Sequence, residues 1–310
     1  MIQLNTNKQL NIILPNTNKA LDEILKSVSP QELKTLNKGK DLNSILNGIL
    51  KQSAQDSSQN KVLLSLLQNS PIFKQIGTLS SNIRELLSSL QSDKSQLSIE
   101  KNLENMLTNI KDVNQKDLKL KFENSGVFLE SKIKNTADIK LKEMFSQDFK
   151  ALLLKAHDEI QNTSTPQKQE ILKQINKLIL QIDYHQLVSH LSNTSSLYIP
   201  YAWDSLEDGN ITIKKAKKGK FFTDIELNLK KYGKLGLRLG LFEDKQLNIN
   251  ITTQNQTLKT LFKESMPILK KSLVAIGIIP TSIRFLDEDS TLSTLYNTSD
   301  DLDMGFEVKV

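Results

Sequence analysis

Residues 221–286 alternate apolar and polar positions in several successive runs. A period of two gives a β-strand one apolar face and one polar face. Polar segments at residues 231–233 and 243–245 separate the first three runs, and their lengths are typical of hairpin turns. The alternating apolar positions are Ile225, Leu227 and Leu229, then Leu235, Leu237, Leu239 and Leu241, then Leu247, Ile249 and Ile251. We therefore expect an antiparallel meander.

The period changes to that of a helix after residue 254. Gly277 is well placed as the C-terminal stop of this helix. Pro267 lies inside it and predicts a kink or two shorter helices, because an interior proline removes a backbone hydrogen bond. A last strand is expected over 282–286, and the helix is long enough to cover the apolar face of the sheet. The apolar helical positions are Leu258, Leu261, Phe262, Leu269, Leu273 and Ile276.

This order of elements resembles the C-terminal domain of the flagellar hook-length control protein family. The resemblance rests on the segment LNLKKYGKLGLRLGL, a polar hairpin, the segment LNINITTQNQTLKTLFKESMPILKKSLVAIGI and a short final strand. It covers about 65 residues, over 221–286. The sequence departs from the family pattern at Lys230, Lys231 and Tyr232-Gly233, where the family often has a proline and a Leu-Gly pair. Two upstream segments, LKLKFENSGVFLESKI and the one from LVSHLSNTSS to KKGKFF, resemble the region before this domain in longer members.

The resemblance implies a protein without enzymatic activity that the flagellar type III apparatus exports from the cytoplasm to the hook. Its C-terminal domain would engage the export-switch component and end hook-subunit export, and its front half would contact hook and hook-cap subunits. We expect a monomer with no cofactor, metal or small-molecule substrate. The strand from Tyr232 to Gly240 and the helix over 254–277 would form the docking platform, closed by the chain end. The candidate partner-binding residues are Tyr232, Gly233, Leu235, Gly236 and Val310.

Helical periodicity dominates the chain before residue 197. Residues 1–20 have short apolar patches among Asn and Thr, which predicts a flexible segment; an export-recognition segment is the alternative that the resemblance offers. Residues 21–115 carry five apolar stripes among polar linkers, which predicts a loose bundle or transient helices. Their apolar positions include Leu21, Ile24, Leu25 and Val28; Leu42, Ile45, Leu46, Ile49 and Leu50; Val62, Leu63, Leu66 and Leu67; and Phe73 to Leu90.

Two further regions complete an expected α+β organisation. In the middle region, 116–196, Leu118, Leu120 and Phe122 alternate with lysines before a turn at 124–126, and a helical hairpin follows. The C-terminal region, 197–310, is expected to be an antiparallel sheet covered by one helix, and an Asp208-Gly209 hairpin signal precedes its meander. Phe306, Val308 and Val310 alternate at the chain end and predict a strand on a sheet edge.

Composition excludes several classes of function. The 310 residues are 38% hydrophobic and 5% aromatic, and the chain has no cysteine, which removes disulfides and thiolate chemistry. The first fifteen residues lack the pattern of a cleavable signal, and no apolar run reaches the roughly 18 residues that span a bilayer.

Candidate chemical groups give no enzyme motif. His185 and His190 are five positions apart, so we expect surface or partly buried helical histidines; Asp183, His185 and Ser189 contain triad residue types without triad geometry. Gly233, Gly236 and Gly240 lie in alternating strands without phosphate-loop spacing, so close packing or a bulge is expected.

The net charge is +6, and its densest cluster comprises Lys214, Lys215, Lys217, Lys218 and Lys220. We expect a solvated hairpin loop there. The alternative function is a basic adaptor that binds nucleic acid or another anionic surface through this cluster, but no aromatic residues interleave with the lysines. Nucleic acid is therefore the less favoured partner.

Overall fold

The structure is a computed structural model that describes residues 18–27, 57–93, 99–135, 138–216, 220–243 and 245–286. Several predictions concern residues outside these ranges. They are residues 1–17 of the flexible segment expected over 1–20, the stripe from Leu42 to Leu50, and the edge strand that ends at Val310. Lys19 and Ala20, at the end of that segment, instead lie in a helix. The described chain divides into a helical unit, which ends at Ser192 and includes residues 200–202, and a sheet unit comprising residues 193–199 and the residues after 202.

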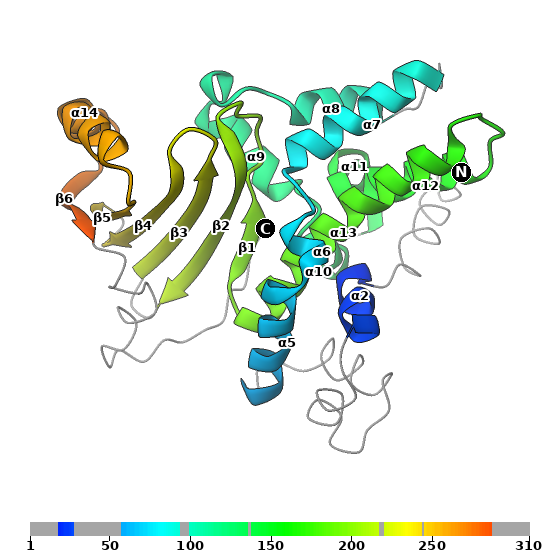
Figure 1. Ribbon diagram of the computed structural model, residues 1–310, viewed down its shortest axis with the longest axis horizontal. Coiled ribbons are helices and arrows are strands. Elements are labelled where there is room, and N and C mark those ends of the chain that lie inside the picture. The colour runs from blue at the N-terminus through cyan, green and yellow to red at the C-terminus, as the bar shows by residue number, and fades with distance from the viewer. Residues whose placement is uncertain are drawn as a thin grey trace. The chain divides into compact units, whose positions relative to one another are not determined.

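The helical unit contains ten α-helices among its described residues (Figure 1). A single 3-10 turn, Ile110–Asp112, lies between α8 and α9. The helices are α2 (Lys19–Ser27), α5 (Ser57–Asn69), α6 (Pro71–Lys74), α7 (Leu79–Asp93), α8 (Glu100–Met106), α9 (Gln115–Glu123), α10 (Leu129–Asn135), α11 (Asp138–Gln147), α12 (Phe149–Gln161) and α13 (Lys168–Ser192).

Helix α13 is the central element of this unit. It packs against α2, α5, α7 and α12, so apolar side chains are needed on several of its faces. Ile171, Ile175, Leu178, Ile179 and Ile182 are fully buried. The pair α12 and α13 forms the helical hairpin that the sequence predicts for the middle region.

The early helices also have a well-packed core. Leu21 and Ile24 of α2 and Leu63 and Leu67 of α5 are each at most 1% exposed, and they form one cluster with Leu187 of α13. This packing is closer than the loose bundle expected from the low apolar content of residues 21–115. Helices on both sides of residue 115 therefore share one core, because α13 supplies the apolar surface that the shorter helices lack.

The predicted alternation at Leu118, Leu120 and Phe122 does not produce a strand. These residues lie in α9, which begins after Asn114, whose side-chain oxygen accepts a hydrogen bond from the Asp117 backbone amide at 2.9 Å. This N-cap satisfies an amide that has no partner within the helix. The predicted turn at 124–126 is present, with Gly126 at a φ of +85°.

The sheet unit has six strands in the order β1-β2-β3-β4-β5-β6 (Figure 1). They are β1 (Ser195–Tyr198), β2 (Leu206–Ala216), β3 (Lys220–Leu229), β4 (Gly233–Phe242), β5 (Gln246–Thr252) and β6 (Ile279–Leu286). The predicted α+β class and the meander over β3, β4 and β5 are confirmed.

The expectation of a wholly antiparallel sheet is wrong, because β6 pairs parallel to β5. Helix α14 (Gln256–Ala275) connects these two strands and returns the chain to the end of the sheet where β5 began. Such a crossover helix is the usual connection between neighbouring parallel strands. The sheet is therefore mixed.

The Asp208-Gly209 signal also does not form a hairpin turn. Both residues lie inside β2, opposite Asn228 and Leu227, next to a shift in strand register at Leu206. A Cβ atom on Gly209 would lie 2.8 Å from Leu227 Cδ2, so close packing explains the glycine at this position. The connection between β1 and β2 lies earlier, over residues 199–205.

Helix α14 continues through Pro267 as one helix rather than two. Pro267 is exposed, so water can reach the Lys263 carbonyl that loses its backbone partner. The helix ends as predicted at Gly277, which has a φ of +82°. The Gly277 amide donates to the Val274 carbonyl at 3.0 Å and the Ile278 amide to the Leu273 carbonyl at 2.9 Å, which is a Schellman motif.

Candidate functional site

Strand register gives the sheet one apolar and one polar face. A central row of the apolar face runs across five strands through Ile211, Ile225, Leu237, Ile251 and Phe285. The next row, on the opposite face, comprises Thr212, Asp224, Arg238, Asn250 and Arg284. The alternation that the sequence shows in β3, β4 and β5 therefore extends to β2 and β6.

A buried ion pair joins β3 to β4 on the polar face. Arg238 Nε donates to Asp224 Oδ1 at 2.7 Å, and Arg238 Nη2 donates to Asp224 Oδ2 at 3.1 Å. The two residues are 6% and 9% exposed. A two-bond guanidinium–carboxylate pair of this kind is directional, so it helps to fix the register of the two central strands.

Gly240 makes room for an aromatic pair on the same face. It lies opposite Phe222, and a Cβ atom on it would approach the rings of Phe222 and Phe242 to 3.2 and 3.0 Å. These two rings pack edge to face with centroids 5.8 Å apart. The expectation of close packing at this glycine is confirmed.

The described candidates for partner binding occupy the β3–β4 turn and the start of β4. Tyr232 is half-buried, with Lys231 Nζ 5.3 Å from its ring centroid, and Gly233 follows with a φ of +72°. Leu235 is 4% exposed in the core, so its side chain is not available to a partner in this fold. Gly236 lies on the polar face between Glu226 and Thr252. Val310 lies outside the described residues, and the partner-binding role of all five stays a prediction.

A shallow cavity of about 320 Å³ lies at this end of the sheet. Gly236 is one of its lining residues, and a Cβ atom built there would lie 3.6 Å from Thr252 Cβ, an ordinary contact distance. Its other lining residues include Asp208, Asn210, Glu226, Asn228, Lys234 and Thr252. The cavity is open, and its lining residues form no set of convergent catalytic groups.

The described part of the lysine cluster does not form one basic surface. Lys214 lies in a polar-face row with Phe222, whereas Lys215 lies in the neighbouring row on the other face. Burial lowers the pKa of Lys214, although the Asp224 carboxylate opposes this effect. Lys220 Nζ lies 5.8 Å from the ring centroid of Phe242. Lys217 and Lys218 are outside the described residues.

Helix α14 covers the sheet less fully than expected. It packs beside β6, with the rings of Phe262 and Phe285 6.3 Å apart, but Leu258 is its only buried residue among those described. Phe262, Met266, Leu269 and Leu273 are half-buried. The sheet-facing stripe is therefore confirmed in part.

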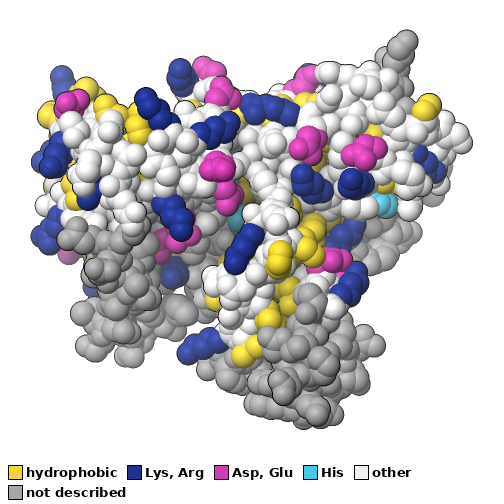
Figure 2. Space-filling view, viewed as in Figure 1, with side chains coloured by type: hydrophobic (Ala, Val, Ile, Leu, Met, Phe, Trp, Pro, Cys, Tyr) yellow, Lys and Arg dark blue, Asp and Glu magenta, His cyan; other side chains and the backbone are white. Residues whose placement is uncertain are grey.

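Apolar side chains are also exposed on α14 and in the residues that follow it, up to the start of β6. Five of the seven large hydrophobic residues exposed in the described chain lie in this stretch: Leu261, Ile268, Val274, Ile276 and Ile279. We call these five residues the outer face of α14. Leu261 and Ile276 were expected in the covered stripe, and that expectation is wrong. Figure 2 shows yellow side chains next to dark-blue ones at the upper left, where Figure 1 places α14.

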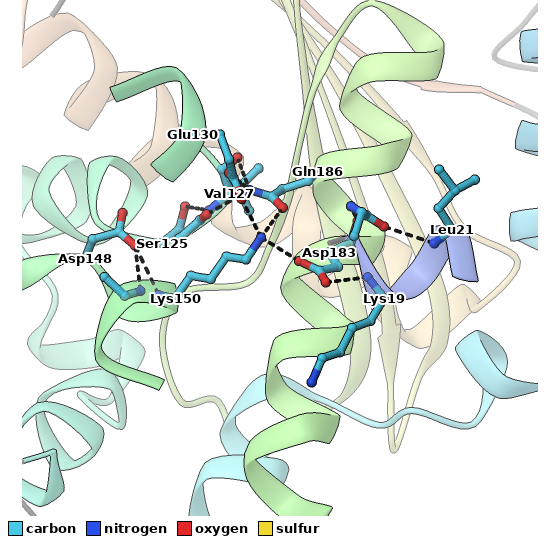
Figure 3. Close-up of polar contacts among 12 residues, drawn as sticks. Lys19, Leu21, Ser125, Val127, Glu130, Asp148, Lys150, Asp183 and Gln186 are labelled. Carbon is cyan, nitrogen blue, oxygen red and sulfur yellow. Dashed lines mark hydrogen bonds and ion pairs between the residues drawn. The ribbon is translucent and has the colours of Figure 1, made fainter. Parts of the chain in front are cut away.

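The helical unit contains a buried charge network centred on Lys150 (Figure 3). Lys150 is 1% exposed, and its Nζ lies 2.7 Å from Asp183 Oδ1 and 2.6 Å from Glu130 Oε1. It also donates to Gln186 Oε1 at 2.7 Å. Asp183 Oδ2 accepts from the Lys19 backbone amide at 2.8 Å, so the network ties α2, α10, α12 and α13 together.

Burial and charge act in opposite directions on the pKa values of this network. Burial would lower the pKa of Lys150, but the carboxylates of Asp183 and Glu130 outweigh it and raise that pKa. Burial raises the pKa of Asp183, and it raises the pKa of Asp148 to about 6. Asp148 Oδ1 also accepts from the backbone amides of Lys150 and Ala151, which begins α12.

The expectation of surface or partly buried histidines is confirmed for the exposed His190 but is wrong for the buried His185. His185 is 5% exposed, not at the surface, and burial lowers its pKa to about 3. The Ser189 hydroxyl donates to the His185 carbonyl at 2.7 Å, and Asp183 pairs with Lys150, so these residues do not assemble a triad.

Among the described residues, no three His, Asp or Glu side chains are grouped to hold a metal ion. The described helices also include none that is long and apolar enough to cross a membrane.

The sheet unit is an α+β domain in which a five-stranded meander is extended by a crossover helix and a parallel edge strand. Residues 209–293 match the family model described as flagellar hook-length control protein FliK. The match begins inside β2 and takes in β3 to β6 and α14, so the chain carries a flagellar hook-length control domain and the resemblance is confirmed. No curated protein and no solved structure matches the chain.

Proposed function

We propose that this protein controls hook length by switching the substrate specificity of the flagellar type III export apparatus. In this role the sheet unit binds the cytoplasmic domain of the export-switch component and ends the export of hook subunits. The protein itself leaves the cytoplasm through the apparatus and contacts hook and hook-cap subunits through its front half. It works by binding, without enzymatic chemistry.

The observation that carries the proposal is the family match over residues 209–293. The matched region lies within the sheet unit, which has exposed apolar side chains on α14, as a docking domain requires. Lys150 and Asp183 of the buried charge network pair with each other and are at most 1% exposed, so a substrate has no access to them. The division of Lys214 and Lys215 between two faces gives no support to the nucleic-acid alternative.

Titration calorimetry with two purified proteins tests this function. The full-length chain is titrated with the cytoplasmic domain of the export-switch component from the same bacterium. We expect saturable binding with one site per chain. The absence of binding at protein concentrations of tens of micromolar would contradict the proposed function, whichever surface is involved.

A further inference from the structure

The outer face of α14 combines exposed apolar side chains with uncompensated positive charge. Ile268, Val274 and Ile276 are 69%, 62% and 75% exposed, values that are high for large aliphatic residues within ordered structure. The helix also carries Lys259, Lys263, Lys270 and Lys271 but only one acidic residue, Glu264. Among the described residues, no acidic side chain pairs with these lysines.

The C-terminal end of this face has a fixed shape. Ile276 and Gly277 belong to the Schellman motif, and the Ile279 amide donates to the Lys245 carbonyl at 2.7 Å where β6 begins. A Cβ built on Gly277 meets no atom within 4 Å, so the turn projects into open space. A rigid apolar projection of this kind suits a preformed protein groove, because little side-chain or backbone order is lost on binding.

We infer that the outer face of α14 is the docking surface of the sheet unit, and that its partner presents an apolar groove bordered by carboxylates. The inference rests on the proposed function, in which that partner is the export-switch component. The apolar side chains give most of the affinity by leaving water, and the four lysines orient the complex through charges at the rim. A protein partner is favoured over a membrane surface because this face exposes no Trp or Tyr among its described residues.

Two variant pairs of the full-length chain test the two parts of the inference by titration with the same cytoplasmic domain. Ile268→Gln with Ile276→Gln removes the apolar centre and should raise Kd at least tenfold, because a few buried side chains dominate interface energies. Lys270→Gln with Lys271→Gln should raise Kd about threefold at low salt, and this difference should shrink at 0.5 M salt.

The chain offers matched controls for both changes. Ile72→Gln with Leu120→Gln makes the same type of substitution at isoleucine and leucine side chains that are 42% and 44% exposed in the helical unit. Lys119→Gln with Lys173→Gln removes two charges from side chains that are 76% and 78% exposed. Both control pairs should bind like the wild type, and circular dichroism verifies that all variants remain folded.

The outcomes separate this inference from the proposed function. If the wild type binds and the variant with Ile268→Gln and Ile276→Gln binds with the same affinity, the docking surface is overturned and the proposed function is left intact. A wild type that does not bind overturns both. Two other results would overturn the named partner. One is a wild-type dimer in sedimentation equilibrium that the variant with Ile268→Gln and Ile276→Gln does not form. The other is binding to anionic phosphatidylglycerol vesicles that this variant alone loses.

Discussion

At the scale of single residues, the most consequential side chains are charged groups that the helical unit buries. Lys150 and Asp183 are 33 positions apart on α12 and α13, and both are at most 1% exposed. Desolvation of each charge is compensated only by the other partners of the network, so removal of one partner leaves an uncompensated buried charge. The sequence analysis considered Asp183 only as a member of a triad that lacks triad geometry, because nothing in a single sequence pairs it with a lysine on the preceding helix.

Substitution of Lys150 with Met should lower the free energy of unfolding of the helical unit by about 3–5 kcal/mol. The cost arises mainly at Asp183, because Glu130 is 55% exposed and can be solvated. Urea unfolding followed by circular dichroism at 222 nm measures the change.

Two further variants make this prediction specific. Addition of Asp183→Asn to Lys150→Met should recover part of the loss, since both buried charges are then absent. Lys155→Met on the same helix removes an exposed pair with Glu159 at 3.5 Å and should cost less than about 1 kcal/mol. A similar loss for Lys150→Met and Lys155→Met would show that burial of Lys150 has no energetic consequence.

His185 should make the stability of the helical unit depend on pH. Its pKa is lowered from 6.5 to about 3 in the folded chain, so between these values the unfolded state binds more protons. Stability should therefore fall as pH decreases through this range, by up to about 1.4 kcal/mol per pH unit. Asp148 has the opposite effect between pH 3.8 and about 6, because its raised pKa makes the folded state bind more protons there.

The contribution of His185 is the difference between the wild type and the His185→Gln variant in the slope of unfolding free energy against pH. Urea unfolding of the wild type and of His185→Gln is measured from pH 4.5 to 7, and stability of the wild type should decrease more steeply toward acid. Parallel curves for the two proteins would contradict a buried neutral histidine.

At the scale of secondary-structure elements, periodicity predicted the strands β3, β4 and β5 and the helix α14 because each follows one regular pattern for five residues or more. It failed where a local helix cap or a tertiary contact decides. Leu118, Leu120 and Phe122 alternate, yet the Asn114 cap favours a helix. The direction of β6 also depends on where α14 ends, which periodicity does not specify.

The C-terminal stop of α14 depends on a glycine in the left-handed region. Gly277→Ala should lower the stability of the sheet unit by about 1 kcal/mol, because a Cβ is unfavourable at a φ of +82° although no atom obstructs it. Gly277→Asn should cost less, since asparagine tolerates this conformation better. Urea unfolding followed by the fluorescence of Trp203, which lies in the sheet unit and is the chain's one tryptophan, measures both changes. Equal losses for Ala and Asn would contradict this explanation.

At the scale of the whole molecule, the α+β class and the family of the C-terminal domain could be predicted, while the candidate docking surface could not. A helical wheel places Leu261 near the apolar stripe of α14, and only the position of the helix beside β6 shows that Leu261, Ile268 and Ile276 remain exposed. The core of the helical unit could not be predicted from the sequence for a similar reason. Leu21, Leu63 and Leu187 come from distant segments, so each stripe alone predicted only a marginal helix.

The measurement that tests the central claim most directly is the length of hooks, by electron microscopy, in the bacterium that encodes this chain. Deletion of its gene should give overlong hooks of broad length distribution, because hook-subunit export does not end. The wild-type gene should restore a narrow distribution, and the variant with Ile268→Gln and Ile276→Gln should restore it poorly although the protein is present at normal levels. Hooks of normal, uniform length in the deletion strain would contradict the account.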